Sequence, residues 1–337
     1  MIFMKAWMIL VFVVTVYLLA VAAASPILDS TLRRVGFTTL QRQLKSRGTF
    51  SKNLVYYGGP VLQSATVNPI FIGPIPDSKR LLEYYAFLVK SPLAQILNSE
   101  YSTSTAQIGY GRLGTPYVEK DPLITGAKTL DDDNDILPYL FDLIVNGIIW
   151  PSPNSYFPIY TQPGVTVTQQ GSKSCIHFCG YHGTFDISDL GIPSTPYLYY
   201  AVIADQSGTC MGGCGISRDP FENLCSVSSH EFTESVTNPA VSYTNSRSPA
   251  APMGWFSPSN YLGGEVADIC NAMQSTLIDP LTGKSWVVQQ VWSNKNVKCM
   301  ASDPRLGGTV QSTVQTSATT VTSKRTTTLL TTKTWKQ

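Results

Sequence analysis

Residues 219–239 constrain the fold more than any other stretch, because DPFENLCSVSSHEFTESVTNP reads as one long helix. Asp219 can cap its N-terminus, Pro220 suits the first helical position, and Glu222 completes a capping box with Asp219. The helix ends at Asn238-Pro239, because a residue before proline avoids the α-helical region. Apolar residues recur at helical spacing and predict a buried stripe of Phe221, Leu224, Cys225, Phe232 and Val236. A neighbouring backbone can approach closely at three small residues, Ser226, Ser228 and Ser229.

The middle of this helix carries the string His230-Glu231-Phe232-Thr233-Glu234. Positions i and i+4 share one helix face, so His230 and Glu234 can hold one divalent ion between them. Glu231 is turned away from that pair but is near enough to act as a base on metal-bound water. This is the geometry of the H-E-x-x-H metallopeptidase helix, except that Glu234 replaces the second histidine. The alternative is a surface helix with acidic residues and one polar histidine.

The first 26 residues, MIFMKAWMILVFVVTVYLLAVAAASP, predict an export signal. Lys5 forms a short positive region, residues 7–21 are apolar, and three alanines precede Ser25 as a small-residue cleavage site. We therefore expect residues 1–24 to be a signal peptide and the protein to be secreted, without membrane attachment after cleavage. The alternative is an uncleaved anchor, because the apolar run is nearly long enough to span a bilayer.

Seven cysteines in an exported chain predict disulfide bonds, and their odd number leaves one thiol over. Cys225 is the candidate for the free thiol, because it lies on the apolar stripe. We expect Cys270 to pair with Cys299. The two C-x-x-x-C pairs are expected to bridge locally or to each other; they are Cys175/Cys179 and Cys210/Cys214. The alternative, a four-cysteine zinc site, is disfavoured by an oxidising compartment.

Strands and helices alternate ahead of residue 219, which predicts an α/β (α+β) domain with a twisted mixed sheet packed on helices. Strands are expected at 66–72, 156–160, 164–168, 196–204 and 285–291, and helices at 77–90 and up to residue 97. The acidic run 131–135 resembles a calcium loop but lacks its glycine and glutamate, so it is interpreted as the capped start of a further helix. Beyond Pro239 the chain is rich in loops.

The remaining segments differ in composition from the domain, which we place at 53–303. Residues 25–52 are polar and basic, and are interpreted as a mobile arm or a pro-segment. Residues 304–337 form a Thr/Ser-rich tail that cannot bury a core, and it is expected to be disordered and O-glycosylated. Net charge is only +2, so electrostatics give no case for nucleic-acid binding.

Several short motifs resemble the secreted EXORDIUM or phosphate-induced protein family of plants, in the same order along the chain. They are Tyr57-Gly-Gly-Pro60, Cys175-x-x-x-Cys179-Gly-Tyr-His182-Gly183 and the Cys210-x-x-x-Cys214 loop. The later motifs are more similar to microbial relatives: Ser229-His230-Glu231 with Glu234, Thr237-Asn238-Pro239, Gly254-Trp255, Gly264-Glu265 to Cys270, and Trp292-Ser293-Asn294 to Cys299. The resemblance covers residues 56–302.

The resemblance implies a single zincin-like domain with a metal site, occupied by zinc or, alternatively, by calcium. His230 and Glu234 would be ligands, with Glu265 or Asp268 as the third ligand and Glu265 preferred. His182 is a rival ligand, although a histidine beside glycines is more often a turn residue bonded to backbone. Glu231 would be the general base.

Two functions follow as hypotheses. The first is a secreted zinc-dependent hydrolase of the peptidase type, whose substrate is a peptide. The second is a non-catalytic extracellular protein that binds a cell-wall polymer, in which aromatic side chains stack on sugar rings: Tyr110, Trp150, Trp255 and Tyr261. The sequence leaves the oligomeric state open.

The signal-peptide interpretation gives a first prediction. The secreted protein should begin near Ser25, because the three alanines before it fit a signal-peptidase site. N-terminal sequencing of secreted material checks this, and a chain that begins at Met1 would contradict it.

Overall fold

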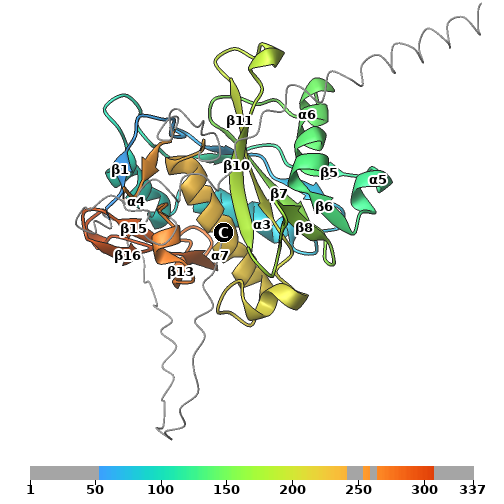
Figure 1. Ribbon diagram of the computed structural model, residues 1–337. Helices are drawn as coiled ribbons and strands as arrows, with labels where there is room; N and C mark the ends of the chain where they lie inside the picture. Colours follow the sequence, from blue (N-terminus) through green and yellow to red (C-terminus); the bar gives the residue numbers. More distant parts are fainter. Residues whose placement is uncertain (1–52, 241–252, 259–263, 307–337) are drawn as a thin grey trace, which may run out of the picture.

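The computed structural model describes residues 53–240, 253–258 and 264–306 (Figure 1). This part of the chain combines mixed β-sheets with helices, so the expected α+β class is confirmed. The predicted signal peptide, the 25–52 segment and most of the tail lie outside the described residues. Within the described residues, no helix is both long and apolar enough to cross a membrane.

A seven-stranded sheet forms the centre of the fold, with the path β10-β11-β7-β2-β4 and β3 between β7 and β5. Its strands pair in parallel except for β10, which runs antiparallel to β11. The predicted strand 66–72 is split at Asn68-Pro69, because proline cannot continue the ladder. The strands are β2 (Thr66–Val67), β3 (Ile70–Ile72), β4 (Arg112–Leu113), β5 (Tyr117–Glu119), β7 (Ser155–Thr161), β10 (Gly180–Asp186) and β11 (Tyr197–Ile203).

Both faces of this sheet are buried, as the alternation along β11 shows. Tyr199, Ala201 and Ile203 join one apolar core, whereas Leu198, Tyr200 and Val202 join the other. The first core contains residues of α7 (Pro220–Thr237), α3 (Ser78–Leu88) and α4 (Pro92–Tyr101), and the second contains those of α6 (Leu137–Val145). Alternate residues of a strand in this sheet therefore belong to different cores, one on each side of the sheet.

Helix α7 is buried on every side rather than along one stripe, since every residue from Asn223 to Thr237 is buried. It lies between the sheet and the C-terminal hairpins (Figure 1). Asp219 caps it as predicted, accepting a hydrogen bond from Phe221 N at 2.9 Å. The capping box is wrong, because Glu222 instead accepts from Ser217 Oγ. The hairpin strands are β13 (Gln274–Ile278), β14 (Ser285–Gln289), β15 (Val291–Ser293) and β16 (Lys298–Met300).

Smaller elements complete the described fold. Asp131 accepts hydrogen bonds from Asp133 N and Asn134 N, so the acidic run does begin a helix, first as a π-helical turn (Asp132–Ile136) and then as α6. The other strands are β1 (Val55–Tyr56), which pairs with β12 (Trp255–Phe256), and the small sheet of β6 (Thr129–Asp131), β8 (Thr166–Gln169) and β9 (Ser172–Lys173). A short helix, α5, spans Pro122–Thr125.

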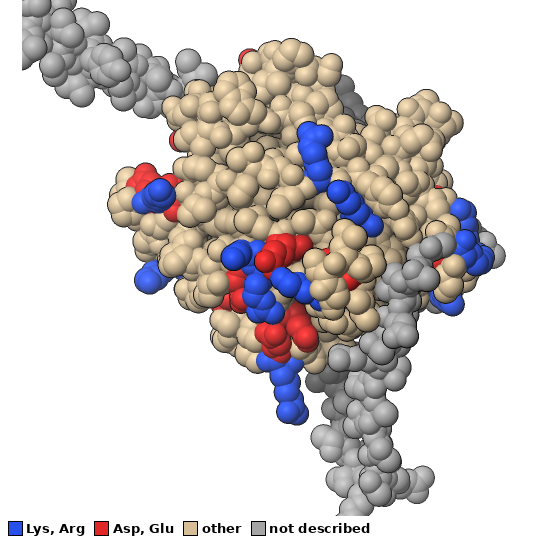
Figure 2. Space-filling model, turned by 180° about the vertical axis from the view of Figure 1, so that it is seen from behind, with Lys and Arg blue, Asp and Glu red and all other residues tan. Residues whose placement is uncertain are grey.

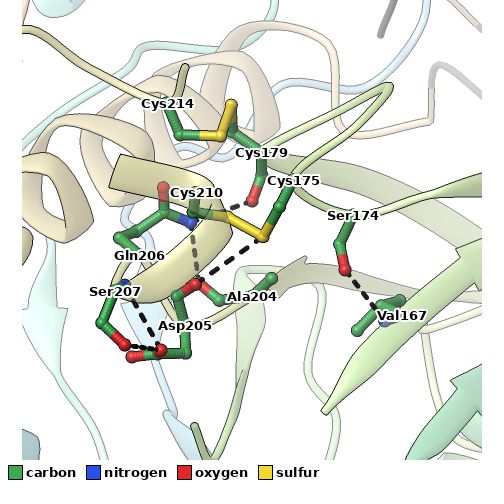
Figure 3. Close-up of a disulfide and its surroundings, with 10 residues drawn as sticks. All are labelled: Val167, Ser174, Cys175, Cys179, Ala204, Asp205, Gln206, Ser207, Cys210 and Cys214. Carbon is green, nitrogen blue, oxygen red and sulfur yellow. Dashed lines mark hydrogen bonds between the residues drawn. A yellow bond between two sulfur atoms is a disulfide. The ribbon is translucent and has the colours of Figure 1, made fainter. Parts of the chain in front are cut away.

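Three disulfides confirm the expected use of the cysteines. Cys175 bonds to Cys210 and Cys179 to Cys214, so each C-x-x-x-C pair bridges to the other (Figure 3). Cys270 bonds to Cys299, and Cys225 is the buried free thiol. The first two bonds tie the segment before β10 to the turn that leads into α7, which excludes the four-cysteine zinc site.

Charged side chains are sparse on the surface. On the face shown in Figure 2, lysines and arginines mix with aspartates and glutamates in a central cluster and in smaller groups at the left and right edges, and most of the remaining surface is uncharged. Lys284, for example, pairs with Glu83 at 2.7 Å. Such pairs between exposed groups contribute little to stability, at most about 1 kcal/mol each.

The C-terminal disulfide gives a stability prediction. The double variant Cys270→Ala/Cys299→Ala should lose about 3–4 kcal/mol of unfolding free energy, because the bond closes a 29-residue separation in the unfolded chain. Urea denaturation followed by circular dichroism measures the loss. Cys225→Ala is the control, since it removes a buried thiol without opening a loop and should cost about 1 kcal/mol. Equal losses in both variants would contradict the prediction.

Candidate metal centre

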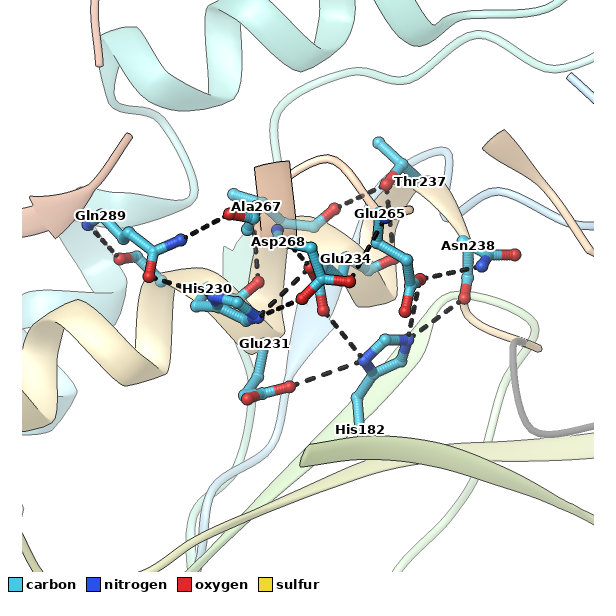
Figure 4. Close-up of polar contacts among 12 residues, drawn as sticks. His182, His230, Glu231, Glu234, Thr237, Asn238, Glu265, Ala267, Asp268 and Gln289 are labelled. Carbon is cyan, nitrogen blue, oxygen red and sulfur yellow. Dashed lines mark hydrogen bonds and ion pairs between the residues drawn. The ribbon is translucent and has the colours of Figure 1, made fainter. Parts of the chain in front are cut away.

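Three separate chain segments bring six acidic or imidazole side chains together (Figure 4). Strand β10 supplies His182, and α7 supplies His230, Glu231 and Glu234. The loop and 3-10 turn ahead of β13 supply Glu265 and Asp268. All the sequence-predicted metal and base residues therefore lie at one place between the sheet and the C-terminal hairpins.

Close packing of α7 on β10 depends on Gly180. A Cβ at this position would lie 2.8 Å from Val227 Cγ1 and 3.0 Å from Glu231 Oε1. Any side chain larger than hydrogen would push the helix off the strand. On the other side of α7, Gln289 N in β14 donates to Ser229 Oγ at 2.9 Å, so a backbone does approach at the small serines.

One group of ligand atoms surrounds His230. Its Nε2 lies 3.2 Å from Glu234 Oε1 and 3.6 Å from Asp268 Oδ1. The i and i+4 residues share a helix face as expected, and Asp268 N also donates to Glu234 Oε1 at 3.0 Å. The three residues can hold a metal ion. Asp268, not the preferred Glu265, completes this group.

A second group surrounds His182. Its Nδ1 lies 3.5 Å from Glu234 Oε2, and its Nε2 lies 3.6 Å from Glu265 Oε1. His182, Glu234 and Glu265 can also hold a metal ion. His182 was considered as a rival ligand, and it is a member of this group. The alternative of a turn residue is wrong, because His182 lies within β10, opposite Ala201 of β11. It therefore faces α7, on the same side of the sheet as the first apolar core.

Two residues to which the sequence analysis gave no role in the site orient the histidines. Gln289 donates from Nε2 to the Ala267 carbonyl at 2.9 Å, which turns its Oε1 toward His230 Nδ1 at 3.1 Å. Because the Gln289 oxygen can only accept a hydrogen bond, this contact requires a proton on His230 Nδ1. In the neutral ring the lone pair is then on Nε2, which faces Glu234 and Asp268. Likewise the Asn238 carbonyl lies 3.3 Å from His182 Nε2, so a neutral ring with its proton on Nε2 has its lone pair on Nδ1, which faces Glu234 and Glu231. Glu265 Oε1 lies 3.6 Å from Nε2.

Burial excludes the alternative of a surface helix. The exposed fractions of His230, Glu231 and Glu234 are 7%, 3% and 0%. Within the described residues, Glu231 Oε2 and Glu234 Oε2 are buried and accept no hydrogen bond, but each lies 3.5 Å from His182 Nδ1. Buried carboxylates are costly unless they are paired or bind a metal, so this chemistry fits a cation.

Without a cation, protons compensate part of the charge. Burial raises the pKa of Glu265 to about 8, helped by Glu234 and opposed by His182. Burial and Glu234 likewise hold the pKa of Asp268 well above its usual value. Burial alone would lower the pKa of both histidines, but the surrounding carboxylates raise both well above the ordinary value. Burial also acts to raise the pKa of Glu234, but the two imidazoles lower it to about 2.

The donor set favours a transition metal over calcium. Each group offers one imidazole nitrogen and carboxylate oxygens, which suit zinc, manganese or iron. Calcium is bound by oxygen ligands, and two inward-facing histidines do not fit that preference. The acidic run 131–135, by contrast, is a helix start.

A surface pocket reaches the cluster from one side. Glu231, His230 and Gln289 line it, so Glu231 faces an opening while it belongs to neither ligand group. The other walls are glycine backbone, apolar side chains, the Cys179–Cys214 disulfide, Ser226 and Asn271. Glu231 and His230 thus line the pocket, although only 3% and 7% of their surface is exposed.

The aromatic residues considered for sugar stacking do not share one environment. Trp150 and Tyr110 are 78% and 48% exposed. Trp255 packs instead on Tyr56 and Tyr101, with ring centroids 5.6 and 5.3 Å away. Tyr261 lies outside the described residues.

No protein-family model matches the chain, and neither curated proteins nor solved structures give a significant match. The resemblance to the EXORDIUM family and to zincins therefore stays a prediction. The residues of the site are therefore the basis for the proposed function.

The pKa of Glu265 gives a pH prediction for the metal-free protein. Folded Glu265 keeps its proton up to about pH 8, whereas the unfolded carboxyl releases it near 4.5. The folded state thus binds more protons between these values, and stability must fall as pH rises through this window. His182, His230 and Asp268, whose pKa values are also raised, act in the same direction.

Urea denaturation at pH 5, 6, 7 and 8 with a chelator measures this slope. Glu265→Gln, which cannot ionise, should show a shallower fall than the wild type. With zinc in place of the chelator, the slope should reverse, because the ion competes with protons for the same ligands. Equal slopes in Glu265→Gln and the wild type would contradict the assignment to Glu265.

Proposed function

We propose that the protein is a secreted, metal-dependent hydrolase that acts on peptides, with zinc as the metal ion. The observation that carries the proposal is the position of Glu231. Its carboxylate lies beside both ligand groups, outside either of them, and lines the pocket that opens to solvent. Ligands next to a carboxylate at an accessible opening are the parts that metal-assisted hydrolysis requires.

The roles divide as follows. His230, Glu234 and Asp268 bind the ion, and Gln289 keeps the lone pair of His230 directed at it. A zinc ion in such a site acts as a Lewis acid and makes bound water acidic. Glu231 takes a proton from the attacking water on its carboxylate and passes it to the leaving amine.

Peptides are the proposed substrates because of the pocket next to Glu231. Its walls are largely apolar or glycine backbone: Phe178, Gly180, Gly213, Gly215 and Val227. Such walls suit a small hydrocarbon side chain better than a sugar ring, which needs many polar partners. The three disulfides agree with an extracellular setting.

The proposal predicts different effects of two variants on the same helix. Glu231→Gln should keep the metal and lower peptide hydrolysis by roughly 100- to 10,000-fold, because it removes only the base. His230→Ala should lose hydrolysis together with the ion that His230, Glu234 and Asp268 would hold. Metal analysis and a peptide-cleavage assay measure the two properties on the same samples.

His177→Ala is the matched control, since His177 is exposed and its Nδ1 accepts from Lys173 N, away from the cluster. It should change neither property. Full activity in Glu231→Gln would remove Glu231 as the base. Wild-type protein that binds zinc but cleaves no member of a broad peptide library would refute the proposed peptidase activity.

A further inference from the structure

Glu234 belongs to both ligand groups of the cluster. His230, Glu234 and Asp268 form one group, and His182, Glu234 and Glu265 form the other. In each group the ligand atoms lie within 4.8 Å of one another. The structure thus offers two adjacent sets of donors with one shared carboxylate, where a single-ion site needs only one set.

The two oxygens of Glu234 face different groups. Oε1 lies 3.2 Å from His230 Nε2, and Oε2 lies 3.5 Å from His182 Nδ1 (Figure 4). Oε2 is fully buried and accepts no hydrogen bond. A carboxylate that offers one oxygen to each of two ions is the bridging ligand of dinuclear carboxylate centres.

Charge balance is compatible with two ions. Four buried carboxylates, those of Glu231, Glu234, Glu265 and Asp268, carry four negative charges when ionised. With one divalent ion, protons on the remaining carboxylates or histidines would have to compensate the other two charges, because a buried charge without a partner is costly. Two divalent ions compensate all four, with both imidazoles neutral as ligands.

We propose that the centre binds two divalent transition-metal ions bridged by Glu234. His230 and Asp268 complete the first site, and His182 and Glu265 complete the second. The Asn238 carbonyl orients His182 as Gln289 orients His230, so each site has its own orienting partner. The inference deepens the proposed function, because both ions lie in the proposed active site, but its test does not need activity.

Metal stoichiometry is the primary test. The purified full-length secreted protein is stripped with a chelator, dialysed against zinc alone and measured by elemental mass spectrometry. We expect two zinc ions per chain in the wild type and in the control His177→Ala. His182→Ala and His230→Ala should each keep one ion, and the double variant none. One ion in the wild type, abolished by either substitution, would overturn the proposal in favour of a single shared ion.

Glu234→Gln tests the bridge, because the amide keeps the shape of the side chain but has no negative charge and only one oxygen that can coordinate a metal. We expect it to weaken binding of both ions, whereas Glu222→Gln near the start of the same helix should keep two. Near-UV circular dichroism selects variants that retain the native fold. If an alanine variant does not fold, His182→Gln or His230→Gln is used in its place. Two ions bound in Glu234→Gln with wild-type affinity would overturn the bridging role.

Manganese provides a readout of distance. Two Mn²⁺ ions that share a carboxylate ligand are magnetically coupled, so the wild type should give a coupled spectrum by electron paramagnetic resonance. Each single-histidine variant should give the signal of an isolated ion. An isolated-ion signal from wild-type protein loaded with two manganese ions would refute the bridged pair.

The two proposals fail in distinguishable ways. A wild type with one zinc ion and intact peptide hydrolysis would overturn the dinuclear centre and leave the hydrolase. A wild type with two bridged ions and no hydrolysis would uphold the centre and overturn the hydrolase.

Discussion

The structure depends on how the charges of a fully buried helix are compensated. Helix α7 is enclosed by the sheet, by α3 and α4, and by β14, so His230, Glu231 and Glu234 are almost completely buried. A helix this deep would ordinarily carry apolar residues all round. The surrounding elements instead bring His182, Glu265 and Asp268 to the same place. These residues add a second imidazole and two further carboxylates, so carboxylates outnumber imidazoles in the cluster.

The disulfides hold the contributing segments in position before any ligand binds. Cys179 immediately precedes β10, and its bond to Cys214 connects that strand to the turn that leads into α7. Cys270 follows Asp268 closely, and its bond to Cys299 fixes the loop that supplies the two downstream carboxylates. Of the three segments that supply ligands, β10 and α7 are therefore covalently restrained relative to each other, and the loop is restrained relative to β16. Pre-organisation of this kind lowers the entropy cost of assembling a site on binding.

Local signals predicted the parts of this site that depend on neighbours in sequence. The Asp219 cap, the proline stop and the i, i+4 pair of His230 and Glu234 were readable from spacing, as was the free Cys225. For His182, a rival ligand in the sequence analysis, a turn residue was the alternative because glycines lie beside it. In the structure these glycines are explained by packing: Gly180 leaves room for α7 beside β10, and Gly183 lies against the Tyr200 ring. The alternation of Tyr181 and Phe185 was the signal for a strand. Gln289 gave no local signal, because its role exists only through contact with α7 across a long sequence separation.

The departure from the H-E-x-x-H pattern has a physical consequence. An imidazole at position 234 would offer one lone pair to a metal, since its other nitrogen carries a proton. A carboxylate has two equivalent oxygens, and those of Glu234 lie toward His230 on one side and His182 on the other. Histidine at this position would serve one ligand group and leave the other without its shared member. Glutamate is therefore the residue type that this double arrangement requires, and the substitution that weakens the sequence motif is the one that makes two adjacent groups possible.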